Sequence, residues 1–445
     1  MEKKVFSEPS NPYRAGIASL FTQEFYQAVT ARLATGGIFL QWLQAYEVDS
    51  QTIRTGYATM ASVFPVVETW QTYPVDLLLV ASMQPIIYDV ARLRTRVGEE
   101  PYKSALAKTW RVTDLEGFLA HYVAGPSLAR AIADSEGNFL NTDDRTLVEF
   151  AFARSVGHNR LFDVGELMQT ARGRNEDRPE LVGGTVDWDG VEDARVALFT
   201  MAGLPPADPP TASPDRRKRA AAQAHYVRGE LDAVLTEWRA QPRQPIGLVE
   251  TVVVATALAN QGDDAALQYI EPLRSFEPAE ADALLGILRW KQGKLQDASD
   301  ALVAAFTRYR DEPWPMPSLM ARVLDVATQP AKQDKVAGRQ LYAAMSQPFS
   351  VYIMEEKRAA AALEIAGKVN FQQLCAEALE PFEPYVPWNR DFLSSRARCY
   401  RETGHVRAAQ AQAELNTFLR DEPVPFGRGI TTPSTAPSPT PTVSA

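Results

Sequence analysis

Apolar and polar positions along the first 85 residues alternate between a strand-like and a helix-like period. Val5-Phe6 begins a short apolar strand, and apolar residues at helical spacing then predict a helix over 19–33. Gly36-Gly37 is expected to end that helix as a glycine C-cap. The β-rich run 38–43 follows and predicts a buried strand.

A second helix is predicted over 50–63, where Pro65 ends it. Two strand-like runs follow, 66–70 and 76–81, and the short gap between them predicts an antiparallel pair. The order β-α-β-α-β-β indicates a partial doubly wound α/β sheet, the second half of such a fold, closed by a hairpin edge.

Residues 86–155 have a largely helical pattern that ends in the polar cluster 141–144. We expect Asn141 or Thr142 to cap a helix, with Asp143 and Asp144 complementing the dipole in its first turn. This local interpretation is favoured over a catalytic role for the cluster.

Residues 156–215 are expected to connect two domains. Gly183-Gly184 lies within this segment, and several prolines fall between 205 and 214. Because proline cannot continue a helix, the domain boundary is predicted near 205–215.

From 216 to 422 the sequence is helical and quasi-repetitive. In its clearest unit, a small residue at Gly286, a turn at Gly293 and a small residue at Ala298 follow the tetratricopeptide pattern. Glycines taken as equivalent lie about 31 to 37 residues apart, with one gap of about twice that length, near the 34-residue period. They are Gly229, Gly262, Gly293, Gly367 and Gly404.

The long gap fits one degenerate repeat with its turn near 329–335, so six helix pairs are predicted. An all-α solenoid is favoured over a non-repetitive helical bundle because the glycines recur regularly. The Pro-, Thr- and Ser-rich segment 423–445 has no apolar period and is expected to be a disordered tail.

Composition narrows the classes of partner. Lys and Arg total 46 and Asp and Glu 55, for a net charge of −9, which does not favour nucleic acid. The two cysteines, Cys375 and Cys399, are too few for a disulfide framework, which fits a reducing cytoplasm. The four histidines show no metal-site spacing, so no metal is expected. Neither a membrane-spanning apolar run nor a signal peptide is predicted, and the localisation is expected to be cytoplasmic.

One motif resembles a known family. The segment Ser7-Glu8-Pro9-Ser10-Asn11-Pro12, continued by Ala15-Gly16-Ile17-Ala18-Ser19-Leu20-Phe21, is similar to the spermidine synthases, the polyamine aminopropyltransferases of the S-adenosylmethionine methyltransferase-like fold. It looks most like the bacterial synthase-like proteins often fused to membrane segments, and the 140–150 stretch resembles a signature of that subgroup. The resemblance covers about a third of the chain, and within it residues 1–85 match the C-terminal half of the family domain.

The resemblance implies roles for four residues. Glu8 takes the place of the family's catalytic aspartate, which helps to deprotonate the attacking amine. Asn11 and Pro12 match the second aspartate and the gate proline, and Tyr73 matches a tyrosine that contacts the amine. Gln41 is added as a weaker substrate-binding candidate, with Gln44 beside it, because both leave a strand at its C-terminal end.

The departures from the family pattern matter for chemistry. Asn11 replaces a carboxylate and cannot act as a base, and the glycine-rich S-adenosyl-binding loop of the upstream half has no counterpart in the sequence. The resemblance implies S-adenosylmethionine, or its decarboxylated form, as the cofactor of the complete family domain. No cofactor is expected for this chain alone. We therefore expect a transferase-related protein that is inactive alone: a truncated gene model, a split gene whose separately encoded partner supplies the N-terminal half, or a decayed remnant. The alternative is a protein-interaction scaffold acting through the helical repeats.

Overall fold

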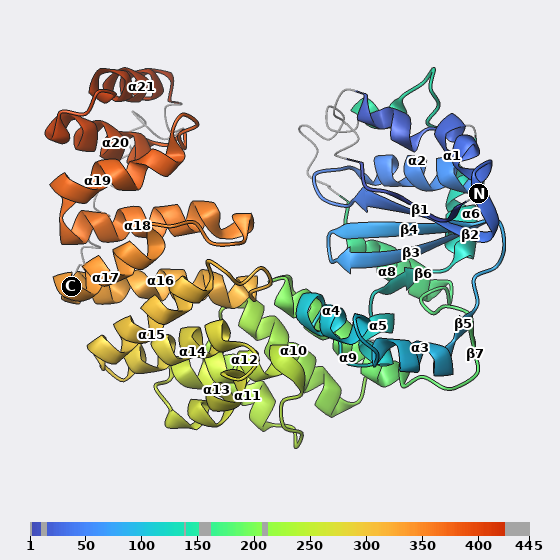
Figure 1. Ribbon diagram of the computed structural model, residues 1–445, viewed down its shortest axis with the longest axis horizontal. Coiled ribbons are helices and arrows are strands. Elements are labelled where there is room, and N and C mark those ends of the chain that lie inside the picture. Colours follow the sequence, from blue (N-terminus) through green and yellow to red (C-terminus); the bar gives the residue numbers. More distant parts are fainter. Residues whose placement is uncertain (1, 10–15, 138, 151–161, 207–211, 423–445) are drawn as a thin grey trace, which may run out of the picture.

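The computed structural model describes residues 2–9, 16–137, 139–150, 162–206 and 212–422. Figure 1 shows a sheet with flanking helices in the N-terminal part and a mostly helical C-terminal region that curves away from it. The candidate site residues Asn11 and Pro12 and the predicted tail 423–445 lie outside the described residues.

The N-terminal part consists of strands and short helices that wrap one sheet. Its elements are β1 (Glu2–Ser7), η1 (Ile17–Phe21), α1 (Gln23–Thr30), β2 (Leu33–Gln44), α2 (Ser50–Ala61), β3 (Val66–Tyr73), β4 (Asp76–Ser82), β5 (Tyr88–Asp89), α3 (Val90–Val97), α4 (Tyr102–Thr109), α5 (Leu115–Leu119), β6 (Tyr122–Ala124), α6 (Pro126–Glu136), η2 (Leu147–Phe150), α8 (Val164–Gly173), β7 (Leu181–Val182) and α9 (Trp188–Met201).

Five strands form the main sheet in the order β1-β2-β4-β3-β6. β1 and β2 run parallel, whereas β4 is antiparallel to both of its neighbours, and β6 pairs antiparallel with β3. The predicted strands, the helix at α2 and the antiparallel pair β3–β4 are confirmed. β6 was not predicted, because a run of three residues is too short to show a period.

The prediction of one helix over 19–33 ended by Gly36-Gly37 is wrong. Thr22 separates η1 from α1, and its side chain accepts a hydrogen bond from the Phe25 amide as the N-cap of α1. Leu33 already begins β2, which continues through both glycines. Gly36 adopts a left-handed φ of 70° near the point where the β1–β2 register shifts. The glycines therefore allow an irregular backbone within the strand and do not end a helix.

The two faces of the sheet carry separate apolar cores. One face packs against α1, α2, α6 and α8, with Phe39 and Phe64 stacked at 5.8 Å between ring centroids. The other face packs against α5 and α9 around Trp70, whose ring meets that of Tyr122 edge-on at 5.1 Å. The N-terminal part is therefore a layered α/β unit.

Asn141 does not cap a helix at the predicted place. Its side chain is fully buried and donates to the Ala18 carbonyl at 3.1 Å, and its oxygen accepts from the Val148 amide at 3.3 Å. The backbone N–H of Asn141 also donates to the Thr59 hydroxyl at 2.9 Å. Thr142 forms an isolated bridge with Arg145 instead of a cap. The cluster ties η1, α2 and η2 together, which is a long-range role that the local pattern could not show.

The segment predicted as a connector, 156–215, contributes two helices to the fold. α8 buries Val164, Leu167 and Ala171 against the sheet. α9 buries Val191 in the core of the opposite sheet face, while its Ala197 and Met201 pack on the core of the helical region. The expected boundary prolines follow α9, so the connector is shorter than predicted.

The C-terminal region is built from helices that follow one another with short turns. They are α10 (Pro214–Arg228), α11 (Leu231–Arg239), α12 (Gly247–Asn260), η3 (Asp264–Ala266), α13 (Leu267–Leu273), α14 (Pro278–Lys291), α15 (Leu295–Arg308), α16 (Pro317–Gln333), α17 (Lys335–Met345), η4 (Tyr352–Met354), α18 (Glu355–Val369), α19 (Phe371–Leu379), η5 (Glu380–Phe382), α20 (Arg390–Thr403) and α21 (Ala408–Asp421).

Four of the five glycines predicted as turns stand between consecutive helices with a left-handed φ of 65° to 83°. They are Gly229, Gly262, Gly293 and Gly404. Gly367 instead lies inside α18, and the turn follows at Asn370. The degenerate turn expected near 329–335 is found at Asp334, which ends α16 and caps α17.

Gly286 allows α14 and α15 to approach closely. A methyl group at this position would lie 2.7 Å from the Leu302 side chain, closer than real Cβ contacts allow. The small residue predicted here is therefore required by the packing of the two helices. Within the described residues, no helix is long and apolar enough to cross a membrane.

The two cysteines form one disulfide bond, which the interpretation of two thiols in a reducing cytoplasm did not anticipate. Cys375 on α19 and Cys399 on α20 are bonded to each other, with a sequence separation of 24 residues. Helix packing brings the two sulfur atoms together, and sequence spacing carries no information about that packing.

Ion pairs join the N-terminal part to the helical region. Lys108 at the end of α4 pairs with Glu312 at 2.9 Å, and Arg111 pairs with Glu277. Arg111 also donates to the Trp314 carbonyl. Together with α9, these contacts fix the two parts against each other.

Candidate functional site

The sheet brings several candidate residues to one edge. Because β1 and β2 are parallel and β4 is antiparallel to β2, Glu8 follows the end of β1 close to where β2 ends and β4 begins. Gln44 faces Asp76 in the β2–β4 register, and Tyr73 faces Asp76 in the β3–β4 register. Ligands of open α/β sheets bind at the carboxyl ends of parallel strands, which is the edge formed here.

The electrostatics of this edge centre on Asp76. Partial burial raises the pKa of its carboxyl, the Trp42 side chain opposes that effect by a hydrogen bond, and the negative charge of Glu8 raises the pKa further. Glu8 itself is exposed. Two carboxylates within electrostatic reach of each other at a sheet edge form a natural site for a cation.

Tyr73 lies at this sheet edge, at the end of β3 and opposite Asp76. Burial, followed by the charge of Asp76, raises the pKa of its phenol, so the phenol stays neutral at physiological pH. Its hydroxyl donates to the carbonyl of Ala202 at 3.4 Å, at the end of α9. The tyrosine therefore links the sheet edge to the helix that reaches the C-terminal region.

The two candidate glutamines, Gln41 and Gln44, lie in different environments. Gln41 is fully buried, accepts from the Tyr26 hydroxyl at 2.6 Å and donates to the Leu20 carbonyl at 2.9 Å. Its amide is thus used inside the α1 side of the core, away from Asp76. Gln44 is also buried, but its side-chain oxygen has no hydrogen-bond partner in the described structure.

Asp76 is the functional candidate that sequence reasoning missed. The only available signal was its position, as the first residue of a strand directly after the Pro74-Val75 turn. Its pairing with Gln44 required the register of the sheet, which a local pattern does not supply. Across the part of the chain that the structure describes, no group of three or more His, Cys, Asp or Glu is placed to hold a metal ion.

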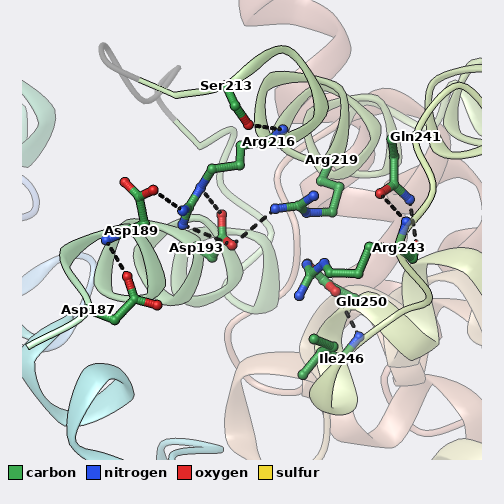
Figure 2. Close-up of polar contacts among 10 residues, drawn as sticks. All are labelled: Asp187, Asp189, Asp193, Ser213, Arg216, Arg219, Gln241, Arg243, Ile246 and Glu250. Carbon is green, nitrogen blue, oxygen red and sulfur yellow. Dashed lines mark hydrogen bonds and ion pairs between the residues drawn. The ribbon is translucent and has the colours of Figure 1, made fainter.

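A second polar group lies where α9 meets α10 and the start of α12, as Figure 2 shows. Arg216 pairs with Asp193 at 3.0 Å and with the more exposed Asp189 at 2.8 Å. Arg219 shares the same Asp193 carboxylate at 3.2 Å. This group borders a cavity separate from the sheet edge.

Next to this group, at the start of α12, Arg243 donates to Glu250 at 2.6 Å, as Figure 2 shows. The second oxygen of Glu250 accepts from the Ile246 amide at 2.8 Å. Burial raises the pKa of Glu250, while this amide hydrogen bond and the charge of Arg243 lower it.

Comparison with known proteins adds no relative. No family model, no curated protein and no solved structure matches this chain. Function therefore has to be argued from the sites themselves.

Proposed function

We propose that the N-terminal part is the amine-binding half of a spermidine synthase-like transferase domain, with Glu8 as its catalytic carboxylate. The observation that carries the proposal is the convergence of Glu8, Tyr73 and Asp76 at one sheet edge. The family resemblance implies that Asn11 takes the place of the second aspartate and Pro12 that of the gate proline; both lie outside the described residues. Gln41 is left out, because its amide is used inside the core.

The chemistry asked of this edge is to bind an ammonium group and remove one proton. An alkylammonium has a pKa of about 10, so it becomes a nucleophile only when a base accepts its proton. Glu8 supplies an exposed carboxylate for that step, and Asp76 adds a second negative charge beside it. Asp76 thereby compensates for the charge lost where Asn11 replaces an aspartate.

The S-adenosyl group implied by the resemblance does not fit the described residues alone. Among them, no glycine-rich strand-to-helix turn of the kind that cradles such a group lies beside β1. The outer edge of β1 has no strand partner in the described sheet, which supports pairing there with a separate half that carries this loop.

Diamine binding tests the proposal. We expect isothermal titration calorimetry to show that putrescine binds the full chain, and that Glu8→Gln and Asp76→Asn each weaken binding at least tenfold, because each removes one of the two charges that attract the ammonium. Glu99→Gln, at an exposed carboxylate after α3, serves as the matched control and should leave the affinity unchanged. Equal affinity in all four proteins, or no heat with wild type, would count against an amine site.

A second function, as an interaction scaffold, is supported by exposed apolar side chains on the helical region. We propose that residues 214–422 form a tetratricopeptide-like solenoid whose C-terminal pairs bind a protein partner. Tyr385 and Trp388 leave 93% and 54% of their surface exposed, which is unusual for aromatic residues in a packed domain.

A fragment test addresses the scaffold. Residues 188–422 include α9 and are expected to fold alone, giving a helical circular dichroism spectrum and one cooperative transition. A partner recovered with this fragment should be lost in Tyr385→Ser/Trp388→Ser and retained in Val336→Ser, a control at an exposed valine on α17. A fragment without helical signal, or equal recovery by both variants, argues against the scaffold.

A further inference from the structure

A cavity of ≈ 560 Å³ lies between the N-terminal part and the helical region. The segment leading into α5 and one side of α9 form two of its walls, and α10 and the start of α12 close it. A volume of this size fits a small organic molecule, and such sites occur preferentially at junctions between domains.

The inner walls of the cavity are apolar. α9 contributes Ala197, Leu198 and Met201. Trp110 lines another wall and stacks on His121, with 3.8 Å between the ring centroids. These surfaces suit a flat, apolar body of a ligand.

His121 does not bring a positive charge to the cavity. The ring is buried, and burial lowers the pKa of the imidazole to about 4, opposed by the hydrogen bond to the Gln71 carbonyl. At neutral pH the imidazole is therefore uncharged, and the cations of the cavity wall are arginines.

The carboxylates of the wall are already engaged. Asp193 is shared by two arginines, and Glu250 holds Arg243 and a backbone amide. Glu116 pairs with Arg94, a contact that lowers the pKa of Glu116 against the effect of burial. The two remaining wall carboxylates accept backbone amides as the N-caps of α5 and α9.

Hydrogen-bond donors are left over on the same wall. The buried Nε of Arg243 has no partner in the described structure, and the same holds for the Nε of Arg219, which does not itself line the cavity. Arg216 pairs there with Asp189 and Asp193, Arg219 with Asp193, and Arg243 with the buried Glu250. The first turn of the 14-residue helix α12 also borders the cavity, and its N-cap Ile246 has no side-chain oxygen to satisfy the free amides.

We propose that this cavity binds a small organic monoanion, an aromatic carboxylate whose ring lies against Trp110 and α9 and whose carboxylate meets Arg243 and the first turn of α12. The unused guanidinium donor and the helix N-terminus supply the anion-binding end, and the apolar walls select the ring. The site is independent of the sheet edge and does not rest on the transferase proposal.

Three probes with one ring system test the assignment on the full chain. Isothermal titration calorimetry with 1-naphthoate, 1-naphthamide and 1-naphthylmethylamine should show the carboxylate binding at least tenfold more tightly than the other two. The double variant Arg243→Gln/Glu250→Gln removes one charge of each sign and should weaken naphthoate binding at least tenfold. Arg289→Gln, whose side chain does not line the cavity, is the control and should bind as wild type does.

A second variant guards against a folding defect in the first. Ala197→Phe fills the cavity from α9 without breaking an ion pair, and it should abolish naphthoate binding while circular dichroism stays unchanged. Tighter binding of the amine, equal binding of the three probes, absence of binding, or naphthoate affinity unaffected by either variant would overturn the proposal.

Discussion

Replacing Arg396 by methionine should lower the free energy of unfolding of the α20–α21 pair by about 3 to 5 kcal/mol. Arg396 is 1% exposed and forms two hydrogen bonds with Glu383, at 2.7 and 3.1 Å. Glu383 also accepts from the Tyr400 hydroxyl at 2.9 Å. Without the guanidinium, the buried Glu383 carboxylate would lose both hydrogen bonds with Arg396 and keep, as its cation, only the more distant Arg407, at 3.8 Å. Because the methionine fills most of the volume, the loss of charge compensation dominates.

A matched control exists on the same helix. Arg390 also pairs with a carboxylate, that of Glu422, but its side chain is 58% exposed. Exposed pairs contribute about 0 to 1 kcal/mol, so Arg390→Met should change stability little. Urea unfolding followed by circular dichroism, with hydrogen exchange to locate the effect, measures both variants. Similar losses in the two would show that burial does not govern these pairs.

Replacing Glu280 by glutamine should stabilise the protein at pH 8 and leave it nearly unchanged at pH 5. The pKa of this carboxyl is raised from 4.5 to about 7. Burial is the main cause and the negative charge of Glu277 adds to it, while a hydrogen bond from the Met316 amide acts in the opposite direction. One Glu280 oxygen accepts from Met316 at 2.9 Å, and the other is buried without a partner. Glutamine keeps the acceptor and carries no charge that has to be buried.

The sign follows from the two pKa values. A raised folded-state pKa means that the contribution of Glu280 to stability is fully present below pH 4.5 and is lost as the pH rises through about 7. At 1.36 kcal/mol per pKa unit, the wild-type carboxylate costs about 3 kcal/mol at pH 8 and under about 1 kcal/mol at pH 5. Thermal unfolding at both pH values checks this, with Glu271→Gln as the exposed control. An equal gain at both pH values would refute the ionisation argument.

Short-range sequence patterns predicted the strands, helices and turns whose conformation is set by residues that are neighbours in sequence. The strands of the antiparallel pair, helix α2 and the turns at Gly229 and Gly293 follow from periodicity and from glycine conformation. The helix expected over 19–33 failed because Thr22 offers a cap and because β1 pairs with a strand that contains glycines. Neither cause is visible within a short window of sequence.

The candidate site was predicted only in part, for the same reason. Glu8 and Tyr73 could be named from a motif, but their meeting with Asp76 depends on sheet register. Asn141 was predicted as a cap because its neighbours are polar, whereas its partners Ala18 and Thr59 are distant in sequence. The bond between Cys375 and Cys399 likewise arises from helix packing.

Helix α9 carries a consequence for how this chain can be divided. Its first half packs on the sheet and its second half on the helical region, so neither core is complete without it. The prolines after α9 mark a boundary in composition, yet a cut there would strip the helical region of part of its apolar cover. In recombination or protein engineering, the transferable unit therefore begins at Trp188, and the helix has to be duplicated if both halves are to persist as separate proteins.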